Sequence, residues 1–237
     1  GGVIQIFTRK GGGALRPSLS LGGGNYRSAD AAANLSGGSD QGWWSLGTSY
    51  QSTQGFNACD GVPGLAGCFT DEPDRDGYRN LAGSARGGYR FGDRGELDLF
   101  WLGTKAQTRF DGSFVNGTKT GQQVIGATGR LSPLDPWGLT LSVGQSRDNS
   151  DNTLEGAFVS RFDTLRDTAS LQSDLALGAG QILTLGVDWQ NDRIDSTEDY
   201  VEDSRDNVGV FGQAQGNLGG HDLSASLRQD DNQQLGR

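Results

Sequence analysis

The sequence predicts an all-β chain: a transmembrane antiparallel up-and-down β-barrel, with about 11 of its strands in these 237 residues. Three observations predict this class. Apolar and polar residues alternate with a period of two in about eleven segments. Those segments run to about 10 to 14 residues, whereas soluble strands usually have about 5 to 6. The connections between them alternate between short turns and long polar loops, as in outer-membrane barrels.

The composition excludes several other classes. Gly contributes 40 residues, hydrophobic residues make up 33%, and the mean hydropathy is -0.53. So much Gly argues against long helices, because Gly costs about 1 kcal/mol relative to Ala in a helix. The 5 Pro and the lack of a G-X-Y period exclude collagen, and 5 Trp, 5 Tyr and 10 Phe argue against disorder. No run of about 18 apolar residues, the length of a transmembrane helix, is present.

The first six strands are expected where apolar residues occupy every second position. Leu15, Leu19 and Leu21 alternate with Arg16, Ser18 and Ser20, and Trp44, Leu46, Thr48 and Tyr50 enclose Ser45, Gly47 and Ser49. The same pattern marks 29–35, 81–89, 97–101 and 125–131. Each segment therefore presents one apolar and one polar face.

Five further strands are expected in the second half, at 139–143, 171–177, 183–189, 208–214 and 223–227. A soluble sandwich would also alternate. The membrane barrel is favoured because the polar face carries charges and Gly, and because the connections differ in length. Lipid would cover the apolar face of every strand, and the interior would stay wet.

Short turns are expected near 36–41, 91–95, 132–136, 178–181 and 216–221. Long polar connections are expected near 55–76, 110–121, 147–163 and 191–206. The first connection of this series, near 22–26, is the one that is short. Seven aromatic residues at or near the strand ends fit an interfacial girdle, namely Trp44, Tyr50, Tyr89, Phe91, Trp101, Trp137 and Trp189. The alternative is ordinary strand aromatics.

Charge and motifs exclude two functional classes. The net charge of -9 and the absence of a basic stripe disfavour nucleic-acid binding. No G-x-S-x-G or HExxH motif occurs, and the single histidine, His221, lies at an expected short turn, so we predict that the chain is not an enzyme. Cys59 and Cys68 share one polar loop, which suggests a disulfide in an oxidising compartment, with two free thiols as the alternative.

Carboxylates in the loops suggest a cation site. Glu72, Asp74 and Asp76 alternate before Gly77, a pattern that suits a hard cation bound by oxygens, and Asp111 in the next long loop can complete it. A solvated acidic turn is the competing interpretation. The acids of 147–163 and 191–206 are expected to be solvated and to contact lipopolysaccharide through cations.

The opening Gly1-Gly2-Val3-Ile4-Gln5-Ile6-Phe7-Thr8-Arg9-Lys10 resembles the plug-to-barrel junction of TonB-dependent outer-membrane receptors. Gly186-Val187-Asp188-Trp189-Gln190, Tyr200-Val201-Glu202-Asp203 and the stretch 228–237 resemble the barrel of the vitamin B12 (cobalamin) receptors of that family. The resemblance implies a 22-stranded barrel around a plug in the bacterial outer membrane. Residues 1–12 would end the plug and its linker, and 13–237 would be the N-terminal half of the barrel. We therefore expect the chain to be a piece of a longer protein.

The resemblance also implies TonB-dependent uptake of cobalamin, with TonB contacting the absent plug and calcium ordering the extracellular loops. The implied calcium ligands are Asn57, Glu72, Asp74, Asp76, Phe110, Asp111 and Asn116, and the implied substrate contacts are Gly112 and Thr164. Asn57 and Asn116 replace Asp, Phe110 replaces Tyr, and Glu72 replaces Gln, which suggests weaker calcium affinity. The alternatives are a receptor for a ferric siderophore or other metal chelate, a passive porin, and an outer-membrane enzyme.

Overall fold

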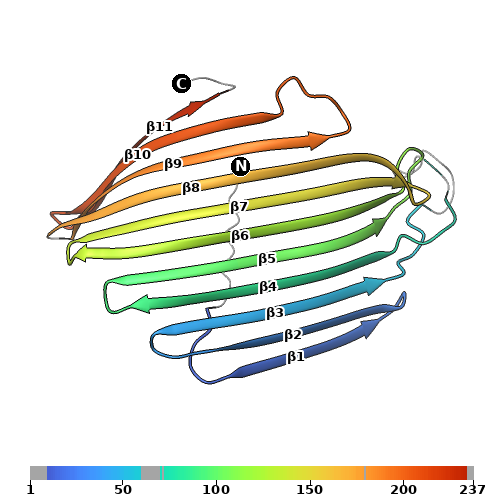
Figure 1. Cartoon of the computed structure of the whole chain (residues 1–237), viewed down its shortest axis with the longest axis horizontal. Coiled ribbons are helices and arrows are strands. Elements are labelled where there is room, and N and C mark those ends of the chain that lie inside the picture. Colours follow the sequence, from blue (N-terminus) through green and yellow to red (C-terminus); the bar gives the residue numbers. More distant parts are fainter. Residues whose placement is uncertain (1–9, 60–69, 71, 179, 234–237) are drawn as a thin grey trace.

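A computed structural model describes residues 10–59, 70, 72–178 and 180–233. These residues form one sheet whose strands pair in sequence order, each antiparallel to its neighbours. The strands are β1 (Arg16–Gly24), β2 (Ser28–Gly38), β3 (Gly42–Thr53), β4 (Tyr78–Phe91), β5 (Gly95–Arg109), β6 (Gly117–Leu134), β7 (Trp137–Leu154), β8 (Ala157–Gly178), β9 (Gln181–Ser196), β10 (Ser204–Leu218) and β11 (His221–Asn232). The predicted eleven-stranded up-and-down sheet is therefore confirmed (Figure 1). Among the described residues, no helix has the length and apolar character needed to cross a membrane.

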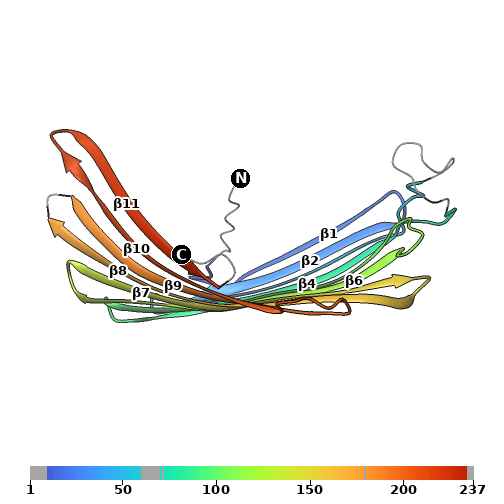
Figure 2. The same cartoon turned by 90° about the horizontal axis from the view of Figure 1, so that it is seen from above.

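The sheet bends into an open arc whose outermost strands are β1 and β11 (Figure 2). The connections between strands differ between the two sides of the sheet at which the strands end. The turns that join β2 to β3, β4 to β5, β6 to β7, β8 to β9 and β10 to β11 form the short-turn end, and the other connections form the long-loop end. The longest of these, between β3 and β4, covers 54–77 and lies at the long-loop end (Figure 1).

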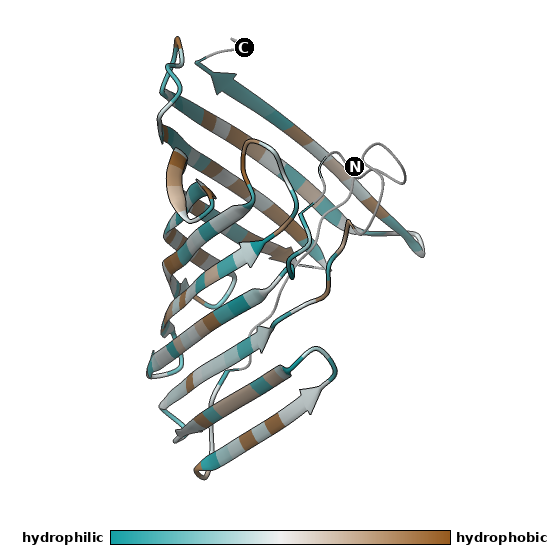
Figure 3. Cartoon of the chain, turned by 90° about the vertical axis from the view of Figure 1, so that its right-hand side faces the viewer, coloured by the Kyte–Doolittle hydropathy of each residue, from teal (hydrophilic) through white to brown (hydrophobic). Residues whose placement is uncertain are grey.

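The sheet has no hydrophobic core among the described residues, where Trp43, 5% exposed, is the one buried hydrophobic side chain. Hydrophobic and hydrophilic residues alternate along the strands (Figure 3). The large apolar side chains stay exposed, as those of Leu46, Leu99 and Leu185 do. The register sets Leu46 beside Ala85 and Leu99 beside Ala127, so the apolar side chains share one face. We call this the apolar face and the opposite one the polar face.

The apolar face has the height of a bilayer core. On β4 it runs from Leu81 to Phe91, ten steps of about 3.3 Å, and a strand tilt near 40° reduces that length to about 25 Å. Tyr89, Phe91 and Trp137 lie at the short-turn end, where the rings of Tyr89 and Phe91 are 5.0 Å apart.

Trp44 and Tyr50 lie near the two ends of β3, as predicted, but two other girdle residues depart from the sequence prediction. Trp101 and Trp189 are in the middle of β5 and β9 rather than at strand ends. Beyond them the same face becomes polar, with Lys105 and Gln107 on β5 and Asn191 and Arg193 on β9. Trp101 and Trp189 therefore mark the edge of the apolar face that is nearer the long-loop end, and the strands continue past that edge.

The predicted long connection at 147–163 is wrong. β7 continues to Leu154, β8 begins at Ala157, and the turn between them holds only Glu155 and Gly156, with φ of 50° and 80°. Two positive φ values suit a tight hairpin turn. The connections predicted at 110–121 and 191–206 also shrink, because β6 begins at Gly117 and β9 continues to Ser196.

Cross-strand polar pairs hold these extensions together. Arg161 on β8 bonds Asp151 on β7, with 2.7 Å between Nε and Oδ1. Asn152 donates to Ser160 Oγ at 3.1 Å, and Gln122 donates to Asp148 at 2.7 Å. Such pairs stabilise a strand outside an apolar environment, so polar composition alone does not end these strands.

The segment before β1 lies against the polar face. Lys10 Nζ is 2.9 Å from Glu96 Oε1 and 4.8 Å from the ring centre of Trp43. A Cβ on Gly11 would lie 1.9 Å from the carbonyl oxygen of Trp44, so only glycine fits there. Residues 1–9, which carry most of the predicted plug junction, lie outside the described residues.

Candidate metal and ligand site

The connections β3–β4, β5–β6 and β7–β8 lie close together at the long-loop end (Figure 1). The β3–β4 connection is closed at its base by Gly55, whose φ is 66° and where a Cβ would lie 1.9 Å from Asp76 O. The Asp76 amide donates to Phe56 O at 3.1 Å. The Arg109 amide donates to Gly77 O at 2.9 Å and so ties this base to the start of the β5–β6 loop.

These contacts bring together three carboxylates from two connections. One oxygen each from Glu72, Asp74 and Asp111 lies within 4.8 Å of the others. Glu72 is held in place because the Gly112 amide donates to its Oε2 at 3.3 Å and Asn116 Nδ2 to its Oε1 at 3.4 Å. We call Glu72, Asp74 and Asp111 the carboxylate cluster.

Asp111 is the most constrained member of the cluster. Both of its carboxylate oxygens are buried, and neither meets a hydrogen-bond donor in good geometry among the described residues. Burial raises the pKa of Asp111, as do the charges of Asp76, Glu72 and Asp74, and the nearby main chain of Cys59 lowers it only in part. A buried carboxylate with so little hydrogen bonding is costly, and a cation bound here would offset that cost.

The other predicted calcium ligands lie close by but use their polar atoms differently. Asn57 Oδ1 accepts from the Cys59 amide at 3.2 Å, and Asp76 Oδ2 accepts from the Ala58 amide at 2.8 Å. Asn116 Oδ1 accepts from the Glu155 amide at 2.9 Å. Phe110 has no side-chain oxygen and is 38% exposed, and its amide donates to Asn116 O at 3.1 Å.

Glu155 joins this region although its sequence position suggested a solvated acid. Asn116 Nδ2 donates to Glu155 Oε1 at 2.8 Å, which links the β7–β8 turn to the β5–β6 loop. A cavity of about 290 Å³ lies between these connections and is lined by Glu72, Asp74, Phe110, Asn116, Thr153 and Glu155 among others. A Glu-Gly pair in a two-residue turn is the sequence signal that could have located it.

The two predicted substrate contacts lie apart. Gly112 is in the β5–β6 loop beside Glu72. Thr164 is within β8, paired with Asp148 on β7 and Ile194 on β9, so β6 and β7 lie between the two positions. Cys59 is disulfide-bonded, whereas Cys68 lies outside the described residues, so the Cys59–Cys68 pairing stays a prediction.

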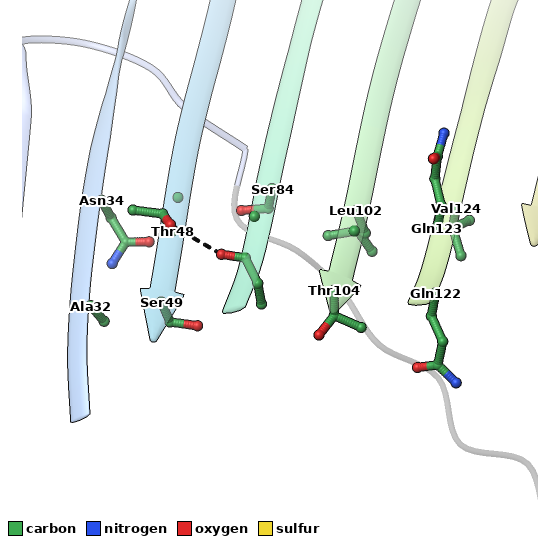
Figure 4. Close-up of a pocket in the computed structure, with 14 residues that line it drawn as sticks. Ala32, Asn34, Thr48, Ser49, Ser84, Leu102, Thr104, Gln122, Gln123 and Val124 are labelled. Carbon is green, nitrogen blue, oxygen red and sulfur yellow. Dashed lines mark hydrogen bonds between the residues drawn. The ribbon is translucent and has the colours of Figure 1, made fainter. Parts of the chain in front are cut away.

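A second hollow, of about 370 Å³, crosses β2 to β6 near the middle of the sheet (Figure 4). Its lining includes the small or uncharged residues Asn34, Ser49, Ser84, Thr104 and Gln122, with Thr48 Oγ1 donating to Ala82 O at 3.1 Å. None of its lining residues is charged.

No protein-family model matches the sequence. The fold is similar to that of the ferric enterobactin receptor from Pseudomonas aeruginosa, with a TM-score of 0.76 at 15% identity over 97% of this chain and 41% of that one. The chain has the fold of part of a receptor barrel.

Two further solved structures share this fold. The ferric yersiniabactin uptake receptor from Yersinia pestis aligns with a TM-score of 0.65 at 13% identity over 95% of this chain and 44% of that one. A copper transporter, OprC, aligns with a TM-score of 0.69 at 15% identity over 95% and 38%. The chain thus spans less than half the length of each of these proteins.

Proposed function

We propose that this chain is part of a bacterial outer-membrane receptor that takes up a metal chelate, of the ferric siderophore class, with energy from TonB. The observation that carries the proposal is the sheet itself, with consecutive antiparallel strands, an exposed apolar face bounded by aromatics, and long connections at one end. Support comes from the similar fold of proteins named as a ferric enterobactin receptor, a ferric yersiniabactin uptake receptor and a copper transporter.

On this proposal the apolar face meets lipid and the polar face lines the interior. Backbone groups within lipid must be paired inside the protein, which a closed barrel achieves and an open sheet does not. The strands that complete the barrel would lie beyond β1 and β11. Residues 10–12 would then belong to the link between a plug and the barrel, and the Lys10–Glu96 ion pair would hold that link to the wall. The receptor binds and transports its ligand and catalyses no reaction.

A second candidate, uptake of vitamin B12, is favoured by the carboxylate cluster. Calcium is bound by carboxylate and carbonyl oxygens, and the buried carboxylate of Asp111, with Glu72 and Asp74 beside it, fits that ion. Glu72, Asp74 and Asp111 would hold it, with Asp76 close enough to affect the charge of Asp111. The bound ion would tie the β3–β4 connection to the β5–β6 loop and so order the surface that meets the ligand.

Calorimetry on the full-length receptor separates the two candidates. The protein is titrated with ferric enterobactin, ferric yersiniabactin and cyanocobalamin, each with and without calcium. Micromolar or tighter binding of a ferric chelate without a calcium requirement supports the first candidate. Binding of cyanocobalamin that depends on calcium supports the second. Binding of none of the three contradicts both.

Paired variants test the role of calcium. Asp74→Ala with Asp76→Ala should weaken any calcium-dependent binding and leave the barrel folded. The control is Asp199→Ala with Glu202→Ala in the β9–β10 loop, which removes the same charge outside the cluster. If both pairs leave calcium dependence unchanged, the cluster is a solvated turn.

A further inference from the structure

Asn116 lies where the β3–β4, β5–β6 and β7–β8 connections come together, and its main chain fixes it there. Its amide donates to Thr153 O at 3.0 Å, and its carbonyl oxygen accepts from the Phe110 amide at 3.1 Å. The bond from Phe110 closes the β5–β6 loop across its base, and the bond to Thr153 joins that loop to the end of β7. The position of the Asn116 side chain is therefore set before any of its own contacts are counted.

Both polar atoms of the Asn116 side chain are used, and they contact two other connections. Nδ2 donates to Glu155 Oε1 at 2.8 Å in the β7–β8 turn and to Glu72 Oε1 at 3.4 Å in the β3–β4 connection. Oδ1 accepts from the Glu155 amide at 2.9 Å. The longer bond to Glu72 is supported by the Gly112 amide, which donates to the other oxygen of that carboxylate at 3.3 Å. One neutral side chain thus links three connections.

Glu155 has an unfavourable backbone conformation that its contact with Asn116 compensates. In a two-residue hairpin turn with positive φ at both positions, Asn, Asp and Gly are preferred at the first. Glu155 occupies that position with φ of 50°, which residues other than glycine adopt uncommonly. Its two hydrogen bonds to Asn116, one through its amide and one through its carboxylate, offset that cost. The link between the two residues thus holds the turn in this shape.

The charges around Asn116 explain why an amide is suited to this position. Neither Glu72 nor Glu155 takes part in an ion pair among the described residues. The Asn116 amide group donates to both carboxylates, and a hydrogen bond to an ionised acceptor is stronger than one between neutral groups. A carboxylate in place of that amide would put three negative charges in contact, and the link would become repulsive.

We propose that Asn116 positions the ligand-facing connections of this chain without a metal ion, by holding the β3–β4, β5–β6 and β7–β8 connections together through its amide. The amide takes the place that a bridging cation would have between the carboxylates of Glu72 and Glu155. Calcium at the carboxylate cluster would add to this link and is not required for it. The proposal rests on the proposed function in that these connections would face the transported ligand. It goes further, because connections that are ordered without calcium make binding of that ligand independent of calcium.

The test measures amide hydrogen exchange by mass spectrometry in the complete receptor, with calcium and with a calcium chelator. Peptides covering 110–117 and 153–157 report the connections on either side of the link, and the peptide 183–189 of β9 reports the fold. We expect the wild type to be equally protected in both conditions. Asn116→Asp replaces the donor by a third carboxylate, so without calcium exchange in the two loop peptides should rise roughly tenfold or more. Calcium should restore the wild-type rate, because the added carboxylate is a ligand that calcium accepts.

Two further variants separate the causes. Asn116→Leu removes the hydrogen bonds without adding charge, so its loop peptides should exchange fast with and without calcium. Asn25→Asp makes the same chemical change as Asn116→Asp at an exposed position in the β1–β2 turn, at the same end of the sheet, and should match the wild type in both conditions. Protection of the wild type that requires calcium overturns the proposal, as does full protection of Asn116→Leu without calcium.

Binding of ferric enterobactin and ferric yersiniabactin is measured on the same samples. Calcium-independent protection of the loops without binding of either chelate contradicts the transport proposal alone. Chelate binding that needs calcium in the wild type contradicts the role of Asn116 alone. Chelate binding without calcium in the wild type, and only with calcium in Asn116→Asp, supports both.

Discussion

The indole of Trp43 lies directly over Gly88 of the neighbouring strand, where a Cβ on Gly88 would come within 2.2 Å of the ring. The same ring is contacted by two cations, Lys10 at 4.8 Å and Arg90 at 5.2 Å. Trp43 thus fills the polar face at the short-turn end and holds the segment that precedes β1. Gly88 is required there because no larger residue leaves room for the indole.

Gly88→Ala in the full-length protein should therefore displace Trp43 and destabilise the barrel by about 1 to 3 kcal/mol. The measurement is the unfolding midpoint followed by heat-dependent mobility in gels, together with tryptophan fluorescence. Gly87→Ala is the control on the same strand, because the nearest atom to its added Cβ is 3.6 Å away. Equal midpoints for the two variants would contradict the proposed packing.

Arg86 and Asp98 form a second close contact on the polar face, with Arg86 Nε 2.9 Å and 3.1 Å from the two carboxylate oxygens. Asp98 is only 3% exposed. Asp98→Ala removes the carboxylate that Arg86 contacts in a largely buried pair, so it should cost about 3 to 5 kcal/mol. Asp135→Ala breaks an exposed pair with Arg94 and should cost less than about 1 kcal/mol. Denaturant unfolding of both variants checks the difference.

The sequence alone was sufficient to predict the strands that carry the apolar face. It was not sufficient to predict how far those strands extend beyond that face. Leu139, Leu141 and Val143 alternate and do lie in β7, but Asn149 to Leu154 have a loop-like composition and still continue that strand. Their pairing depends on partners such as Arg161 on another strand. A period of two is visible in one segment, whereas a polar cross-strand pair requires knowledge of the register.

The candidate site also combines residues that the sequence could predict with contacts that only the structure shows. Alternating carboxylates marked Glu72 and Asp74, and the structure places Asp111 beside them from a separate connection. That the Asn57 and Asn116 oxygens are occupied by main-chain amides depends on loop conformation, which composition does not encode. The ligands that the resemblance implies at these two positions stay predictions.

The predicted disulfide between Cys59 and Cys68 is tested by intact mass. The purified protein measured without reductant should be two hydrogens lighter than after reduction, because pairing removes one hydrogen from each thiol. Reaction of both cysteines with a thiol reagent before reduction would contradict the pairing. Cys59→Ser provides the control, since it leaves Cys68 without a partner in the same chain and should make one thiol reactive.

The raised pKa of Asp111 predicts a pH dependence of calcium binding. Burial and the charges of Asp76, Glu72 and Asp74 make Asp111 hold its proton to a higher pH than an ordinary aspartate, whose pKa is 3.8. Calcium must displace that proton, so calcium affinity should fall as pH falls, beginning above the normal aspartate range. Without calcium, the stability of the folded loops should change with pH in the opposite direction. Ionised Asp111 destabilises the folded loops at high pH, and protonation removes that cost as the pH falls through the pKa of Asp111. Equilibrium calcium binding from about pH 7 to about pH 4 measures the effect, and Asp111→Asn should bind calcium more weakly and lose this step in the profile. An identical profile in wild type and Asp111→Asn would show that Asp111 does not contact the ion.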